Sequence, residues 1–189
     1  MISSTMKKKW ATIIVVIFAA VGLWLYFGVS SVFTAERDLL MRLDELVTYY
    51  ASLDADYVQP LITNSVLPDA DKATLAAISS QLKTLASSTE ASEKFDNLLL
   101  AQKATMSFFI TPGLPEEFTA DARYVNWNKN ASNLGDTSRL VHDYNVALSL
   151  YNARLRSPAG KIARYWRTIQ HRSYLGVDGT LQDETRVSF

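Results

Sequence analysis

One stretch near the start of the chain limits how the rest can fold. From Trp10 to Ala35 no residue is charged, and most residues in the run from Ile13 to Val29 are aliphatic or aromatic. As a helix rising about 1.5 Å per residue, these 26 residues span roughly 39 Å, whereas the hydrocarbon core of a bilayer is about 30 Å thick. A buried core helix is the alternative, but such helices are usually shorter and carry polar positions. The stretch therefore predicts a transmembrane anchor, which we place at residues 10–33.

The charges on either side predict the orientation of this anchor. Three lysines occupy positions 7–9, whereas residues 36–38 carry charges of both signs. Positive charge is retained in the cytoplasm. Residues 1–9 are therefore predicted to be cytoplasmic, and residues 34–189 to lie in the periplasm or outside the cell.

A cleavable signal peptide has the same polarity, but its apolar core spans about 7 to 15 residues and ends in a small-x-small site. The core here is longer, and Phe33 occupies the position where cleavage after Ala35 would require a small residue. We favour an uncleaved signal anchor, while Ser30, Ser31 and the pair Ala19-Ala20 keep cleavage open as the alternative.

Beyond the anchor, apolar residues recur at steps of three and four, which predicts helices. The first runs from about Lys9 to Tyr57, continuous with the anchor, and Pro60 bends or ends it. Further helices are expected at residues 70–86, 91–110, 121–155 and 161–171, and residues 115–122 form a loop or a short helix. No alternating strand pattern is evident. Because each apolar stripe must be buried, the predicted fold is all-α: one transmembrane helix that continues into an antiparallel bundle of about four helices.

Single residues add local expectations. Asp69 or Asp71 can cap the helix at 70–86, whose buried stripe is Leu75, Ile78, Leu82 and Leu85. Gly135 dents the helix at 121–155, at a cost of about 1 kcal/mol relative to alanine, without having to end it. The carboxylates Asp44, Glu45, Asp54 and Asp56 are interpreted as solvated faces or caps. Residues 176–179 are interpreted as a turn.

The segment at 140–174 carries a recognisable pattern. The residues Tyr144-Asn145-Val146-Ala147 are followed by Tyr151-Asn152 and, past Leu155, by Pro158. This order resembles the Tyr-Asn-x-Ala-x-x-x-Tyr-Asn signature of the LemA family of bacterial membrane proteins. Ser157-Pro158 stands where the family has a Phe-Pro turn, Tyr165-Trp166 supply aromatics after it, and Val187-Ser188-Phe189 resembles the family's closing Val-x-Phe. Earlier, residues 51–54 with Pro60-Leu61 resemble a second family stretch, without the Arg-rich piece between them.

The resemblance implies an N-terminal anchor in the inner (cytoplasmic) membrane of a bacterium and a helical bundle outside the cytoplasm. The family supplies no established enzymatic activity, no catalytic residues and no cofactor. Some relatives act in membrane-associated assemblies, including organelle formation in magnetotactic bacteria, which by analogy implies a scaffold.

The signature residues also have a physical interpretation. Tyr144 and Tyr151 lie two helical turns apart, so both rings project from one face and can pack in the core. Asn145 and Asn152 share the neighbouring face, where side-chain hydrogen bonds could fix connecting loops. Partner binding by these residues is the alternative.

A basic segment follows the signature. It contains Arg154, Arg156, Lys161, Arg164, Arg167 and Arg172. One interpretation is contact with anionic lipid headgroups or with an acidic partner. The other, which we favour on sequence grounds, is a solvated helix whose cations pair with carboxylates of neighbouring helices.

Several function classes are disfavoured. Lys+Arg and Asp+Glu number 19 each, so no general attraction to nucleic acid is expected. Cysteine is absent, and the two histidines, His142 and His171, lack the spacing of a metal site. No Gly-x-Ser-x-Gly elbow marks a nucleophile. We therefore predict no catalytic residues, no metal and no cofactor.

The expected function is a non-enzymatic, membrane-anchored scaffold or protein-interaction module of the cell envelope. An envelope hydrolase or sensor with an unrecognised site among the third and fourth helices is the alternative. The expected partners are the lipid bilayer, through residues 10–33, and an unidentified envelope protein. A homo-oligomer packed through Ala19 and Ala20 is a third hypothesis.

Overall fold

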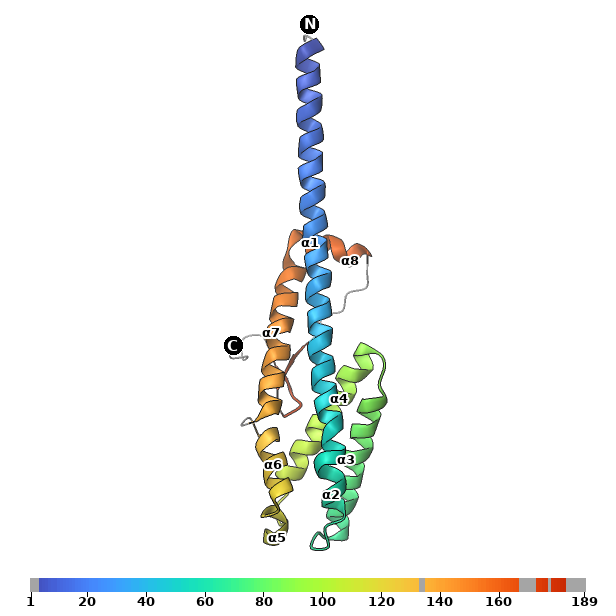
Figure 1. Cartoon of the computed structure of the whole chain (residues 1–189), viewed down its shortest axis with the longest axis vertical. Coiled ribbons are helices and arrows are strands. Elements are labelled where there is room, and N and C mark those ends of the chain that lie inside the picture. The colour runs from blue at the N-terminus through green and yellow to red at the C-terminus, as the bar shows by residue number, and fades with distance from the viewer. Residues whose placement is uncertain (1–3, 133–134, 167–172, 177, 183–189) are drawn as a thin grey trace. The chain divides into compact units, whose positions relative to one another are not determined.

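The structure, a computed structural model, describes residues 4–132, 135–166, 173–176 and 178–182. Its helical elements are α1 (Ser4–Leu53), the π-helical turn η1 (Asp54–Val58), α2 (Gln59–Ile62), α3 (Asp69–Ser87), α4 (Ala91–Phe109), α5 (Glu116–Thr119), α6 (Ala122–Ala131), α7 (Asp136–Arg156) and α8 (Pro158–Trp166) (Figure 1). Two short strands, β1 (Tyr174–Leu175) and β2 (Leu181–Gln182), pair antiparallel, with Leu175 opposite Leu181. The prediction of an all-α fold is confirmed.

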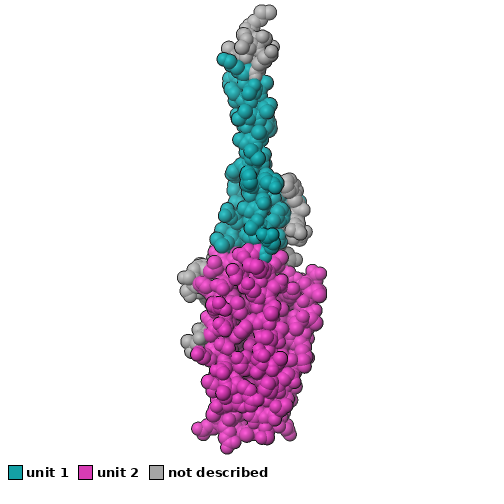
Figure 2. Space-filling model, in the orientation of Figure 1, with its two compact units in different colours: residues 1–37, 150–171 teal, residues 38–149, 172–189 magenta. Residues whose placement is uncertain are grey.

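The chain divides into two compact units (Figure 2). Unit 1 comprises Met1–Arg37 and Leu150–His171, and unit 2 comprises Asp38–Ser149 and Arg172–Phe189. The first part of α1 and the end of α7 with α8 therefore belong to unit 1. The rest of both helices belongs to unit 2 with the remaining elements.

The first helix continues from the uncharged stretch into unit 2. The helical run Lys9–Ile62 is long and apolar enough, by length and composition, to cross a membrane. Pro60 does not break this run, because the backbone widens into the π-turn η1 just before it. There the N–H of Gln59 donates to the carbonyl of Asp54, five residues back. A proline lacks an N–H and crowds the preceding turn, and the wider turn accommodates both effects.

Unit 2 is built on the predicted apolar stripes. The side chains of Leu75, Ile78, Leu82 and Leu85 on α3 are all buried, as are Leu39, Leu43, Leu46, Tyr50 and Leu53 on α1. Burying one such leucine stabilises the fold by roughly 1.5 to 3 kcal/mol. These stripes therefore position the helices of unit 2.

Aromatic rings fill the part of the unit 2 core between α4, α5 and α6. Phe108 stacks on Trp127 with ring centroids 6.0 Å apart and meets Phe118 edge-on at 6.3 Å. Tyr124 lies 5.2 Å from Phe118. Phe108, Phe118 and Trp127 are almost fully buried, so this cluster anchors the two shorter helices to α4.

The single helix expected at 121–155 is wrong, because the chain forms α6 and α7 with a break between Ala131 and Asp136. The reason lies at Gly135, where an added Cβ would meet the side chain of Asn130 and lie 2.8 Å from its Cα. The backbone returns so close to α6 that no side chain fits. Gly135 therefore allows a tight connection between two helices.

Two further expectations are corrected. Neither Asp69 nor Asp71 caps α3, whose N-cap position is Pro68, without a side-chain hydrogen bond. The last helix begins at Pro158, earlier than expected, and its predicted end at His171 lies outside the described residues. The strand pair β1–β2 was not predicted, whereas the expected turn before β2 is present at Asp178, whose carboxylate accepts from the N–H of Thr180 at 3.1 Å.

Candidate functional site

An open polar groove of about 610 Å³ runs along α3 in unit 2. Its lining residues come from α2 and α3 and are Gln59, Ile62, Ala76, Ser79, Ser80, Lys83, Thr84 and Ser87. Most of them carry a hydroxyl, an amide or an ammonium group. A groove of this chemistry suits a ligand that forms hydrogen bonds.

A buried carboxylate lies beside this groove. Asp54 begins η1 and is 9% exposed. Its Oδ1 accepts a hydrogen bond from Nε2 of Gln59 at 3.2 Å, and its Oδ2 lies 3.7 Å from Nζ of Lys83. The sequence interpretation of Asp54 as part of a solvated face or a cap is therefore wrong. A buried carboxylate needs such partners, because burial without them costs several kcal/mol.

Gln59 joins the π-turn to α3. Besides Asp54, its Nε2 reaches Oγ of Ser79 at 2.6 Å, and Ser79 is 3% exposed. The side chain of Lys83, one turn further along α3, is 65% exposed. The arrangement holds one ammonium group at the groove surface above a carboxylate whose two oxygens both have partners.

The hydroxyls of the groove partly serve the helix itself. Thr84 donates to the carbonyl of Ser80 at 3.0 Å, and Ser87 donates to that of Thr84 at 2.9 Å. A hydroxyl that donates in this way keeps lone pairs free to accept. Together with the Lys83 ammonium, the surface can receive donors and carboxylates from a partner chain.

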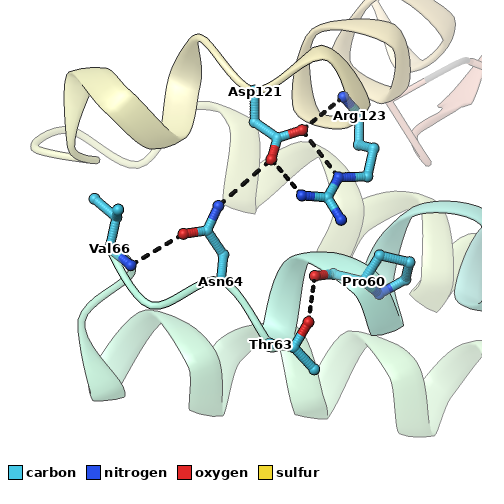
Figure 3. Close-up of polar contacts among 6 residues, drawn as sticks. All are labelled: Pro60, Thr63, Asn64, Val66, Asp121 and Arg123. Atoms are coloured by element: carbon cyan, nitrogen blue, oxygen red, sulfur yellow. Dashed lines mark hydrogen bonds and ion pairs between the residues drawn. The ribbon is translucent and has the colours of Figure 1, made fainter.

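Polar contacts also fix the loop that follows α2 (Figure 3). Nδ2 of Asn64 donates to Oδ2 of Asp121 at 3.4 Å, and Oδ1 of Asn64 accepts from the N–H of Val66 at 3.0 Å. Arg123 donates to both Asp121 oxygens, through Nε at 3.0 Å and Nη2 at 2.6 Å. Asp121 also caps α6 by accepting from the N–H of Arg123 at 2.9 Å. This network connects the α2–α3 loop to the start of α6.

The Arg123 guanidinium lowers the pKa of Asp121. Hydrogen bonds from the Arg123 side chain are the largest cause of the lowered pKa, and partial burial opposes them. The backbone N–H of Arg123, its positive charge and the amide of Asn64 also lower the pKa. The charged form of Asp121 is therefore the one that the fold stabilises.

The signature residues lie on α7 and at the start of α8. Tyr144 and Tyr151 are 0% and 1% exposed, and Ala147 is also buried. Asn145, also buried, binds both backbone polar groups of Leu175 in β1, which is the loop contact expected for it. Asn152 is 8% exposed and belongs to unit 1, and Pro158 is the first residue of α8.

The cations of the basic segment that the structure describes lie at the surface of unit 1. Arg154, Arg156, Lys161 and Arg164 are all exposed, while Arg167 and Arg172 lie outside the described residues. His142 is exposed on α7, and His171 is outside the described part of the chain. Within that part, no group of three His, Cys, Asp or Glu side chains is placed to hold a metal ion.

Sequence reasoning missed the groove and its carboxylate. A signal was present, because Asp54 follows Tyr50 by four residues and therefore falls on the buried stripe of the first helix. An acidic residue on such a stripe predicts a partner inside the fold. Comparison with known proteins found no matching family model, no similar curated protein and no similar solved structure.

Proposed function

We propose that the protein is a non-enzymatic interaction module of the bacterial cell envelope, held in the inner membrane by α1 and binding a partner protein through the groove along α3. The N-terminus lies in the cytoplasm and unit 2 lies on the outer side. The observation that carries the proposal is the contrast along α1, whose first part is apolar and uncovered while its later part is the core of unit 2.

The exposed side chains of that first part support the anchor. Apart from Leu25, which is half-buried, the large apolar residues from Trp10 to Phe27 are 47–72% exposed, among them Ile14, Phe18 and Leu23. A soluble protein rarely presents so continuous an apolar surface to water. The lysines at 7–9 support a cytoplasmic N-terminus, because positive charge is retained on that side.

Contacts between helices support an antiparallel bundle formed by α1, α3, α4 and α7. Nζ of Lys94 on α4 lies 2.8 Å from Oδ1 of Asp44 on α1. Phe95 on α4 lies 6.3 Å from Tyr144 on α7, measured between ring centroids. With the Tyr-Asn repeat on α7, this arrangement is consistent with a divergent LemA-like protein, which we propose as its class.

The groove supports partner binding over catalysis. Convergent carboxylates would favour a hydrolase, whereas the carboxylate beside this groove, Asp54, is engaged by Gln59 and Lys83. Lys83 and the neighbouring hydroxyls offer a polar surface that complements an acidic, hydrogen-bonding segment of another protein.

The anchor and its orientation can be tested in intact cells. The chain lacks cysteine, so single cysteines introduced as Ser4→Cys and Ser92→Cys report their own side of the membrane. A membrane-impermeant maleimide that reaches the outer face of the inner membrane should label position 92 and not position 4, and alkaline carbonate should leave the chain in the membrane. Labelling of position 4 alone, or extraction by carbonate, would refute the proposed topology.

The partner site can be tested by photo-crosslinking in the same cells. A photoreactive residue in place of Ser80, in the groove, should capture a specific protein, and Lys83→Glu should abolish that adduct. The same residue in place of Ser92, which is exposed on α4 outside the groove, is the matched control. If position 80 captures no protein that position 92 does not, the groove is not the partner site.

A further inference from the structure

Helix α8 is docked on α1 by a contact that leaves no room for a side chain. A Cβ built on Gly28 would lie 2.5 Å from Cβ of Ala159. Two helices approach this closely only through small residues. Ala159 and Ala163, one turn apart on α8, are both buried. The small-residue face of α8 therefore lies against α1 at Gly28.

The connection from α7 fixes the direction of α8. Ser157 donates through Oγ to the carbonyl of Arg154 at 2.6 Å and accepts from the N–H of Gly160 at 3.1 Å. It is thus the N-cap of α8, with Pro158 at the first helical position, where proline is favoured. A side chain on Gly160 would collide with the backbone of Arg154 and Leu155. The turn is therefore tight, and α8 is held in one orientation.

This docking point coincides with the end of the uncovered part of α1. From Lys9 to Phe27 the helix is almost wholly exposed, and burial begins at Val29 and Val32. In Figure 2 this part of unit 1 is the narrow stem. These 19 residues rise about 28 Å, close to the roughly 30 Å hydrocarbon thickness of a bilayer. If the stem crosses the membrane, α8 lies at the level of the headgroups.

The exposed side of this region is basic. Residues 28–37 and 150–166 contain five cations and one carboxylate, Glu36. Among the described residues no ion pair involves Arg154, Lys161 or Arg164, so the pairing with neighbouring carboxylates that we favoured from the sequence is not found for these three. Tyr165, the residue after Arg164, is 89% exposed, and tyrosine is enriched at membrane interfaces.

We infer that α8 with the end of α7 forms a binding site for the phosphate groups of anionic lipids, through Arg154, Lys161 and Arg164, in the leaflet where α1 leaves the hydrocarbon. The inference rests on the proposed membrane anchor. Each cation near an anionic surface strengthens binding about fivefold, which corresponds to about 1 kcal/mol. Removing two of them should weaken the preference for anionic lipid by up to about thirtyfold.

The test uses the full chain in vesicles, with a fluorophore on a single cysteine introduced as Tyr165→Cys. One vesicle preparation contains brominated phosphatidylglycerol diluted in phosphatidylcholine, and the other contains brominated phosphatidylcholine at the same fraction, with unbrominated phosphatidylglycerol. Bromine quenches the fluorophore only at short range. In the wild-type chain we expect stronger quenching by brominated phosphatidylglycerol than by brominated phosphatidylcholine. The double variant Lys161→Gln with Arg164→Gln should lose this difference in quenching. The charge-matched control Lys103→Gln with Lys129→Gln should keep it.

The outcomes separate this inference from the membrane anchor. A chain that fails to float with the vesicles refutes the anchor and the lipid site together. If the chain floats with the vesicles but the two brominated lipids quench it equally, the lipid site alone is refuted. This result is expected if the natural ligand of the basic surface is an acidic protein. A preference that Lys161→Gln with Arg164→Gln leaves unchanged also overturns it.

Discussion

The side-chain amide of Asn145 pairs with the backbone of Leu175 as a neighbouring strand would. Its Nδ2 donates to the Leu175 carbonyl at 2.8 Å, and its Oδ1 accepts from the Leu175 N–H at 2.9 Å. Both partners are buried. Within unit 2, Asn145 of α7 thereby fixes the β1–β2 hairpin, although Leu175 lies thirty positions further along the chain.

Replacing Asn145 by leucine should destabilise the protein by about 2 to 4 kcal/mol. The substitution leaves a buried donor and a buried acceptor of Leu175 without partners, at about 1 to 3 kcal/mol each. Chemical denaturation measures the loss, and hydrogen exchange at the Leu175 amide should accelerate. Asn126→Leu, at an exposed position of α6, is the control, and equal stability of the two variants would contradict the assigned role.

The two signature tyrosines should behave as core residues. Tyr144→Ala and Tyr151→Ala are each expected to lower the free energy of unfolding by about 3 to 5 kcal/mol, since both rings are buried. Tyr165→Ala, at a highly exposed site, should change it by less than about 0.5 kcal/mol. Unchanged melting of the first two variants would instead assign the rings to a binding surface.

The stability contributed by Asp121 should depend on pH. Its folded pKa is lowered, so the unfolded chain, with a pKa near 3.9, binds the proton more readily. The contribution is complete above the unfolded pKa and disappears as the pH falls through the lower folded pKa. Asp121→Asn should therefore destabilise the protein at neutral pH, and the gap from wild type should shrink on acidification. Asp96→Asn, on the exposed face of α4, should show no comparable gap at either pH.

Two glycines with left-handed backbone form a matched pair. Gly179 has φ 75°, and an added Cβ would lie 2.8 Å from the N of Lys103 and 2.9 Å from the O of Leu99, whereas Gly113 has φ 89° and open space. Gly113→Ala should cost about 1 to 2 kcal/mol from conformation alone. Gly179→Ala should cost more, because the hairpin must also move away from α4. Thermal unfolding of both variants decides this, and equal losses would show that the contact with α4 is not tight.

Apolar periodicity was sufficient to predict α1, α3 and α4, because residues at steps of three and four share one face of a helix. The stripe of α3 and the continuity of α1 past Ala35 follow directly from it. The separation of α6 from α7 does not, since it depends on how closely Gly135 approaches Asn130. The two-residue strands β1 and β2 are too short to show alternation.

The candidate site was harder to predict than the helices. Asp54 falls on the buried stripe of α1, four residues after Tyr50, but the π-turn that begins at this residue is not visible in the apolar pattern. The partners of Asp54, Gln59 and Lys83, come from different elements and share no sequence motif. The basic segment was recognised from composition, but its position relative to the uncovered helix requires the contact between Gly28 and Ala159.

The uncovered part of α1 is bounded by polar groups at both ends. The lysines at 7–9 precede it, and the docked helix α8 follows it. Because the helix between them is unbroken, this distance of about 28 Å cannot shorten or stretch. With the proposed anchor, a thicker bilayer would either have to thin around the protein or draw Arg164 toward the hydrocarbon, and hydrophobic mismatch costs a fraction of a kcal/mol per ångström. The protein should therefore concentrate in thin regions of a membrane, so that lipid chain length alone would sort it.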